Sequence, residues 1–372
     1  MSNYIAAMSY IRFYFLIVFL ALLFGAFGEM KRNKKKNYVT LTFLIFFIVM
    51  AFRSEYMGND TTSYIALFKR ISTIKSPQEF INISDVEAGY IRYCWLISRF
   101  WGERALFVIS SAIVNFSVGR FVYKYVKYPG IFCCLFVGIM QFDFFLSAMR
   151  QSLSVALLLF AFDKIVENKK ISFFILWYIA FQFHNSAIIF ILIAPFIFKT
   201  KQEKLSTNLG LYFFLFITVF IASFMFDNVF EKILSIFPKY NYYINTELTD
   251  GETRIAVYLK IIVFALLLFV PKIYKYNLIK DIKIYNYGEK LSIINMSIMI
   301  VALNATALMR FTGTFGVFAL MQFSNSYEKA TNEDKKILTV LSVLCFFVYG
   351  LVLVVLKTPE WQTTYPIIFS FK

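Results

Sequence analysis

Long apolar runs separated by short polar segments make up most of the chain. A helix needs roughly 18 or more consecutive apolar residues to cross the hydrocarbon core of a bilayer, and many runs approach or exceed that length. The pattern predicts an all-α, polytopic transmembrane helical bundle of about 12 spans. We place them near residues 5–27, 38–52, 105–123, 130–147, 149–166, 171–183, 185–198, 206–226, 254–274, 290–308, 311–328 and 335–356.

Residues 53–104 interrupt this series of spans and are expected to stay together on the outer side. Within them, residues 88–100 have a helical pattern but are too short to cross the membrane at about 1.5 Å per residue. Glu87, Arg92 and Arg99 make this stretch amphipathic. We therefore expect short interfacial or re-entrant helices on the outer side.

The spans at residues 171–183 and 185–198 are also short. We expect a pair of helices broken around His184 and Asn185, because one long helix would disturb the topology. A second outer loop is expected over residues 227–253, where acidic side chains and tyrosines suit either a sugar site or a solvated loop.

Composition supports a membrane protein. Of the 372 residues, 59% are hydrophobic and 20% aromatic, which excludes an ordinary soluble domain. The net charge of +16 comes from short Lys and Arg clusters between apolar runs, which is typical of cytoplasmic loops and not of a nucleic-acid-binding face. The clusters lie at residues 31–36, 124–127, 164–170, 199–204, 272–290 and 329–336.

Placing every basic cluster in the cytoplasm turns both termini outward and makes residues 1–372 a single integral membrane domain. The first apolar run is too long for a signal peptide and is expected to be retained as a span. The four cysteines have no metal-ligand spacing, so we expect neither disulfides nor a metal site.

This topology places a set of polar residues at one membrane face. Ionisable groups are costly in hydrocarbon, so their gathering at one face indicates a functional site. The set comprises Arg53, Asp60, Glu87, Arg92, Asp143, Arg150, Gln151, His184 and Arg310.

The strongest candidates in this set are three arginines, because each interrupts or ends an apolar run: Arg53, Arg150 and Arg310. A guanidinium stays charged and grips phosphate oxygens bidentately, so these arginines fit a lipid diphosphate. Alternatively, each arginine simply reaches lipid headgroups, as we expect of Arg12.

Asp60, Glu87 and His184 are the candidate general bases. Either carboxylate could deprotonate a sugar hydroxyl or merely pair with Arg53 or Arg92. His184, the only histidine, could act as base, donate a hydrogen bond to a sugar or serve a structural role in the bundle.

Five short elements occur in order along the chain. They are Arg53 with Gly58, Asp60, Tyr64 and Phe68; Glu87 with Gly89 and Tyr90; Met149, Arg150 and Gln151; Phe183, His184, Asn185 and Ser186; and Arg310 with Phe311. On these elements the sequence resembles the EpsG family of bacterial membrane proteins, which belongs with the Wzy-type polymerases of O-antigen, capsule and exopolysaccharide. The resemblance covers roughly residues 40–325.

The resemblance implies a glycosyltransferase in the bacterial plasma membrane, with its active site facing outward and no cofactor. Such an enzyme transfers a growing glycan from undecaprenyl diphosphate onto a lipid-linked repeat unit. The resemblance also implies a flippase and a chain-length regulator as partners. The residues that we expect to bind the diphosphate and the substrate are Arg53, Tyr64, Arg92, Arg150, Gln151 and Arg310. The alternatives are another lipid-linked glycosyltransferase or an O-antigen ligase, a lipid-linked oligosaccharide flippase, and a structural scaffold.

Overall fold

A computed structural model describes most of the chain. The described residues are 3–198, 212–213, 215–219, 255–272, 281–303, 308–357 and 364–370. Every regular element in these ranges is a helix, and the one β-type contact is an isolated bridge between Arg53 and Phe369. The all-α fold predicted from the apolar runs is therefore confirmed.

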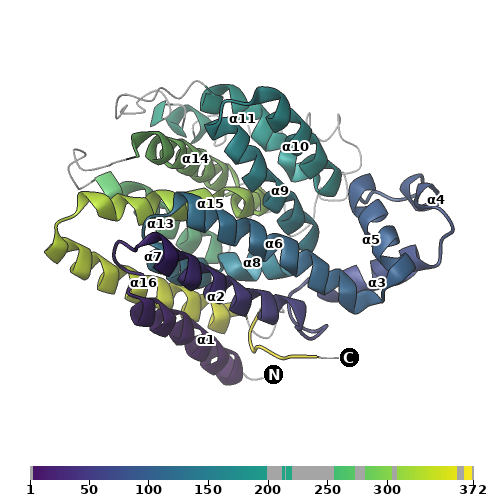
Figure 1. The fold of residues 1–372 in the computed structure, drawn as a ribbon, viewed down its shortest axis with the longest axis horizontal. Coiled ribbons are helices and arrows are strands. Elements are labelled where there is room, and N and C mark those ends of the chain that lie inside the picture. Colours follow the sequence, from purple (N-terminus) through teal and green to yellow (C-terminus); the bar gives the residue numbers. More distant parts are fainter. Residues whose placement is uncertain are drawn as a thin grey trace. The chain divides into compact units, whose positions relative to one another are not determined.

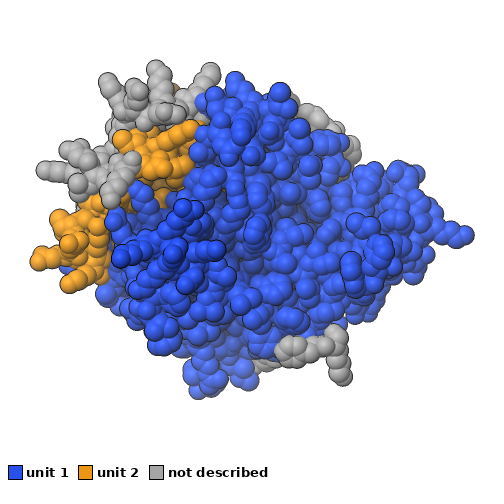
Figure 2. All heavy atoms as spheres, viewed as in Figure 1, with its two compact units in different colours: residues 1–199, 337–372 blue, residues 200–336 orange. Residues whose placement is uncertain are grey.

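The chain forms two compact units (Figure 2). Unit 1 comprises Met1–Lys199 and Ile337–Lys372, and unit 2 comprises Thr200–Lys336. The main helices of unit 1, labelled in Figure 1, are α1 (Asn3–Phe24), α2 (Arg32–Ala51), α6 (Glu103–Tyr125), α9 (Met149–Val166), α10 (Lys170–Phe183), α11 (Ile188–Phe198) and most of α16 (Asn332–Lys357).

Within the described residues, three helices are long and apolar enough to cross a membrane. They are α1, α6 and α16. The predicted span at residues 130–147 is instead a bent pair, α7 (Pro129–Gly138) and α8 (Gln141–Ser147), whose axes meet at 64°. The bend occurs where Met140 takes a left-handed conformation, with φ of 60°, which a continuous helix does not accommodate. Counting this pair as one crossing gives up to four spans in the described part.

Aromatic side chains fill the interior between α1, α2, α7 and α8. The Phe46 ring lies 4.9 Å from that of Phe142, and Phe13 lies 5.4 Å from Phe142, measured between ring centroids. Offset and tilted rings at these separations add specific attraction to the burial of apolar surface. This packing holds the end of α2, and the loop that follows it, against α8.

The predicted outer segment 53–104 contains short helices (Figure 1). They are α3 (Thr61–Ser72), α4 (Pro77–Ile81) and α5 (Ala88–Phe100). On α3, the buried residues Tyr64, Phe68 and Ile71 follow the spacing of one helical face. The amphipathic helix expected at residues 88–100 is present as α5.

Unit 2 contains α13 (Ile255–Phe269), η3 (Val270–Lys272), α14 (Ile282–Val301), α15 (Met309–Ser326) and η6 (Tyr327–Lys329). A Cβ placed on Gly288 of α14 would lie 2.8 Å from the Cβ of Gln322 on α15, so the glycine permits close packing of these helices. The second outer loop at residues 227–253 and most of the predicted span at 206–226 lie outside the described residues.

Candidate functional site

An ion pair between Glu87 and Arg150 joins two distant segments of unit 1. Arg150 Nη1 donates to Glu87 Oε2 at 2.8 Å, and the Glu87 side chain is only 8% exposed against 29% for Arg150. Glu87 immediately precedes α5, while Arg150 lies in the first turn of α9. The backbone N–H of Asn185 donates to the other carboxylate oxygen, Oε1, at 3.1 Å. Glu87 thus connects three segments that the sequence pattern indicated separately: the start of α5, the start of α9 and the turn at Asn185.

Close packing of α5 against α10 makes this meeting possible. A Cβ added to Gly89 would lie 2.6 Å from both the backbone oxygen and the Cβ of Gln182. No side chain fits in that space, so glycine allows the start of α5 to approach the end of α10. The break at His184 then turns Asn185 toward Glu87, and the helix break predicted at these two residues is confirmed.

Two buried tyrosines line the ion pair. The rings of Tyr64 and Tyr90 have centroids 6.0 Å apart, and the Tyr90 hydroxyl donates to the sulfur of Met149 at 3.6 Å. The Tyr64 phenol lies within hydrogen-bonding reach of Arg150. Burial raises the pKa of Tyr64, and the Arg150 charge opposes that rise, so Tyr64 remains protonated at neutral pH.

Arg53 is a buried cation with unused hydrogen-bonding capacity. It is 2% exposed, and its Nη1 donates to the Met50 carbonyl at 2.8 Å. Its Nε and Nη2 have no hydrogen-bond partner among the described residues, and its guanidinium lies 4.5 Å from the centroid of the Phe107 ring. Burial lowers the pKa of Arg53 to about 9, which still leaves it charged at neutral pH. Tyr64 and Tyr90 both interact with it electrostatically.

Arg104 supports the backbone at Arg53. The sequence pattern did not identify Arg104 as a site residue. Its Nη1 donates to the Arg53 carbonyl at 3.0 Å and to the Ala51 carbonyl at 3.4 Å. These bonds cap the end of α2 and fix the backbone that carries the Arg53 side chain. The signal that could have identified Arg104 is a charge in the first turn of an apolar span, α6.

Asp60 differs from Glu87 in having a free carboxylate. It precedes α3, is half-buried, and its side chain makes no hydrogen bond or ion pair with the described part of the chain. Its charge contributes to raising the pKa of Tyr64, which places it beside the same tyrosine that Arg150 approaches. Gly58, with φ of 83°, provides the left-handed turn that precedes it.

His184 is held by its own turn. Its Nδ1 accepts the backbone N–H of Ser186 at 3.1 Å and lies 2.7 Å from the Ser186 hydroxyl oxygen. Because Nδ1 accepts, the hydrogen of the neutral imidazole lies on Nε2. In this arrangement Nε2 is a hydrogen-bond donor.

Asp143 anchors the C-terminal segment near the site. Its Oδ1 accepts the backbone N–H and the hydroxyl of Thr364, each at 2.6 Å. Further along, Ser54 N donates to Ile368 O at 2.8 Å, and Ser370 N donates to Phe52 O at the same distance. Residues 364–370 therefore run beside the Arg53 loop, although no role for them follows from the sequence.

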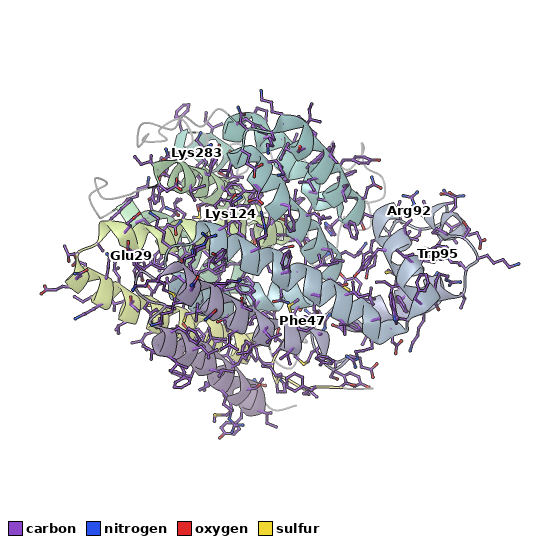
Figure 3. All side chains as sticks on the ribbon, viewed as in Figure 1. Glu29, Phe47, Arg92, Trp95, Lys124 and Lys283 are labelled. Carbon is purple, nitrogen blue, oxygen red and sulfur yellow. The ribbon has the colours of Figure 1, made fainter. Side chains whose placement is uncertain are left out.

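The remaining predicted binding residues are Arg92, Gln151 and Arg310. Arg92 is exposed on α5 and takes no part in the cluster, and Figure 3 labels it beside Trp95 on that helix. Gln151 is buried next to Arg150 in the chain. Arg310 is exposed in the first turn of α15 and belongs to unit 2. In the described ranges, no group of three or more His, Cys, Asp or Glu could hold a metal ion.

Residues 36–369 match the model of the EpsG family, which covers nearly the whole chain. The protein belongs to the EpsG family. This is a family of polysaccharide polymerase-type membrane proteins, whose activity is that of a glycosyltransferase-like polymerase. No curated protein and no solved structure matches the chain.

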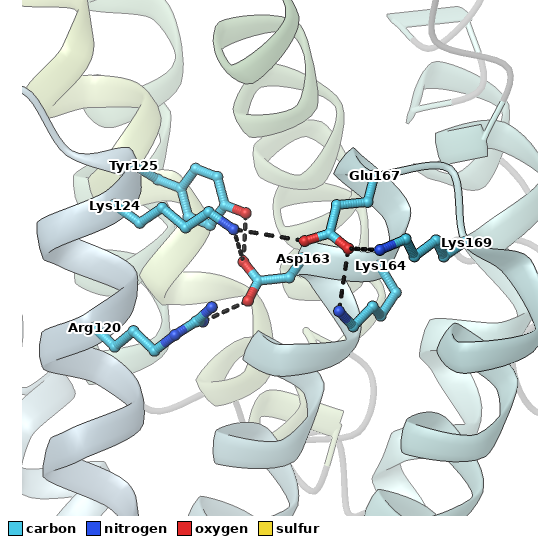
Figure 4. A network of polar contacts seen from close by, with 7 residues as sticks. All are labelled: Arg120, Lys124, Tyr125, Asp163, Lys164, Glu167 and Lys169. Carbon is cyan, nitrogen blue, oxygen red and sulfur yellow. Dashed lines mark hydrogen bonds and ion pairs between the residues drawn. The ribbon is translucent and has the colours of Figure 1, made fainter.

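A second polar network lies at the other end of α9 in this EpsG family member (Figure 4). The buried Asp163 pairs with Arg120 and Lys124 and accepts the Tyr125 hydroxyl, so it joins α9 to α6. It lies 13 positions after Arg150, or about 20 Å along the helix. The basic clusters at residues 124–127 and 164–170 thus share one end of these helices, opposite Glu87 and Arg150.

Proposed function

We propose that the protein is a polysaccharide polymerase of the Wzy type. It transfers a growing glycan from undecaprenyl diphosphate onto a lipid-linked repeat unit at the outer face of the bacterial plasma membrane. The observation that carries this proposal is the convergence of Arg53, Arg150, Glu87 and the turn at His184 in unit 1. Membership of the EpsG family supports the same reaction class.

The reaction requires two kinds of assistance. The bond between the anomeric carbon of the donor glycan and the diphosphate oxygen breaks, and a hydroxyl oxygen of the acceptor sugar forms the new glycosidic bond. The diphosphate leaves with the bonding electrons, so its developing negative charge needs cationic partners. The acceptor hydroxyl loses its proton to a base.

Arg53 and Arg150 supply the cationic partners. In the part of the chain that the structure describes, three of their donors have no hydrogen-bond partner: Nε and Nη2 of Arg53 and Nε of Arg150. A diphosphate oxygen would satisfy them with charge-assisted hydrogen bonds. Burying a donor without a hydrogen-bond partner costs free energy, so these donors favour the binding of an anionic ligand.

Asp60 is the base that this geometry favours. Both oxygens of Glu87 already accept hydrogen bonds, from Arg150 and from Asn185, so Glu87 positions the guanidinium and the turn. The Asp60 carboxylate is free to accept a proton. His184, with its hydrogen on Nε2, would donate to a sugar hydroxyl.

The distribution of the Lys and Arg clusters supports the proposed orientation of the protein in the membrane. With the basic clusters in the cytoplasm, the Glu87 and Arg150 end of α9 faces outward, both termini lie outside, and about 12 spans complete the bundle. The Asp163 network supports this assignment because it gathers two of the clusters at the opposite end of α9. A flippase delivering the lipid-linked repeat and a chain-length regulator are the partners that such an outward site requires.

Substitution of Arg150 tests the proposal in cells. In a deletion strain complemented to equal protein level, Arg150→Ala and Arg150→Lys should both abolish long polymer, because an ammonium cannot replace a bidentate fork. Arg92→Ala is the matched control, since Arg92 is exposed on α5 and lies outside the cluster. Unchanged polymer length in both Arg150 variants would refute the assignment of Arg150 to the diphosphate site.

A further inference from the structure

A cavity of about 700 Å³ opens between α1, α2 and the C-terminal segment. Its walls are mainly apolar side chains, including Leu16 on α1, Ile48 on α2, and Pro366 and Phe369 on the segment that Asp143 anchors. The volume falls within the range of pockets that hold small molecules. In the described part of the chain, Arg12 is the charged residue that lines it.

Arg12 has no partner within the described part of the chain. It is exposed, and its guanidinium makes neither a hydrogen bond nor an ion pair there. It lies nine residues after the start of α1, or about 14 Å along the axis, in a helix apolar enough to cross a membrane. A charge at such a position is costly without a counter-ion, so it indicates a site for an anionic group.

The cavity is continuous with the loop that carries Arg53. Phe369, which lines the cavity, forms the isolated β-bridge with Arg53. Ile48 and Val49 line it from the last turn of α2, only a few residues before Arg53. Ser9, which also lines it, accepts the backbone N–H of Ile367 at 2.9 Å. One wall of the cavity is therefore fixed to the candidate active site.

We propose that this cavity is a binding site for the lipid carrier itself, an isoprenoid diphosphate. The isoprenoid chain lies along the apolar walls, and Arg12 pairs with the diphosphate as the carrier reaches or leaves the Arg53 loop. The chemistry of the walls matches such a ligand, which joins one long hydrocarbon chain to one anionic group. This assignment rests on the proposed function, because it takes its ligand from that reaction.

Photoaffinity labelling tests the assignment without relying on catalysis. The purified protein in nanodiscs is irradiated with a polyprenyl diphosphate that carries a photoreactive group in its chain, and the labelled peptides are mapped. Label is expected in residues 4–16, 45–49 or 366–369. Arg12→Ala should reduce this labelling about tenfold, the effect of one lost charge-assisted hydrogen bond. Arg32→Ala is the control, because Arg32 lies at the opposite end of α2 and bonds Tyr123.

A second variant tests the cavity without removing the charge. Ile48 is 39% exposed, so Ile48→Trp should fill the cavity without disturbing the core and should also reduce labelling. Labelling elsewhere, labelling unchanged in both variants, or equal displacement by excess phosphatidylglycerol would overturn the assignment. The last result would mean an ordinary bilayer lipid site.

Polymer formation, measured on the same preparations, separates this inference from the proposed function. Polymer formation without label in the cavity would overturn the carrier site and leave the polymerase in place. Label in the cavity that depends on Arg12, in a protein that forms no polymer from lipid-linked repeats, would support the carrier site and contradict the polymerase.

Discussion

At the scale of single residues, the surroundings of two carboxylates assign them different tasks. Glu87 is nearly buried, and each of its oxygens accepts a hydrogen bond, whereas the Asp60 side chain has no hydrogen bond in the described residues. A base must have an oxygen free to receive the proton. We therefore assign Glu87 to positioning its hydrogen-bond partners and Asp60 to accepting the proton.

Asp60→Asn should lower the initial rate of chain elongation about 10²- to 10⁴-fold, the range usual for loss of a general base. The amide keeps the shape of the side chain but cannot accept the proton. Elongation is measured with purified protein and lipid-linked repeat units. Asp85→Asn, at an exposed position before α5, is the control and should keep the full rate. Equal rates in the wild type and Asp60→Asn would exclude Asp60 as the base.

Lys35 offers a prediction on pH dependence at the other end of α2, before the predicted span. Burial, with a smaller contribution from the charge of Lys127, lowers the pKa of Lys35 to about 8 from 10.5. Between these values the unfolded chain binds more protons than the folded one, so the free energy of unfolding should rise with pH from about 8 to 10.5 and level off below pH 8, where both states are protonated.

Amine acylation followed by mass spectrometry measures this pKa directly. The reactivity of Lys35 should have a midpoint near pH 8 in the folded protein and near 10.5 in the unfolded chain. Lys127→Ala should raise the folded midpoint, because a like charge is removed. A folded midpoint equal to the unfolded one would contradict the burial of Lys35.

The residues of the candidate site could be predicted singly but not as pairs. Glu87 and Arg150 each stand out as charges beside apolar runs, but they are 63 positions apart, and no local pattern states which arginine meets which carboxylate. Arg104 was missed because it makes its contribution through backbone carbonyls. The occupied oxygens of Glu87 likewise depend on tertiary contacts.

At the scale of elements, local patterns predicted helices well where one face is apolar. The amphipathic stretch at residues 88–100 coincides with α5, and the break at His184 and Asn185 occurs where polar residues interrupt two apolar runs. The bend between α7 and α8 was not predicted, because it depends on a left-handed conformation of Met140 that the mainly apolar run over residues 130–147 does not indicate. Hydrophobicity alone does not distinguish a straight span from a bent one.

Gly89 provides the test at this scale. Gly89→Ala should push α5 from α10, because the new Cβ would lie 2.6 Å from Gln182 backbone and side-chain atoms. Separating Glu87 from Asn185 should then sharply lower polymer yield. Gly102→Ala is the matched control, because a Cβ there meets nothing within 4 Å. Polymer yield is compared at equal protein level, and a normal yield from Gly89→Ala would show that this close approach is dispensable.

At the scale of the whole molecule, the C-terminal segment packs against segments that lie far from it in the sequence. Thr364 bonds Asp143, and Ile368 and Ser370 pair with residues 52–54, so the end of the chain supports the loop that carries Arg53. Such long-range contacts have no sequence signature. The family match over residues 36–369 includes this segment, in agreement with its place beside the candidate site.

The most direct test of the central claim is the length distribution of glycans made by the purified protein from lipid-diphosphate-linked repeat units. A polymerase with its diphosphate site at Arg150 should produce a ladder of products, and Arg150→Lys should abolish it while Arg92→Lys keeps it. Addition of a single unit would indicate another transferase or a ligase. Lipid movement across vesicles without any new glycosidic bond would contradict the enzyme and indicate a flippase.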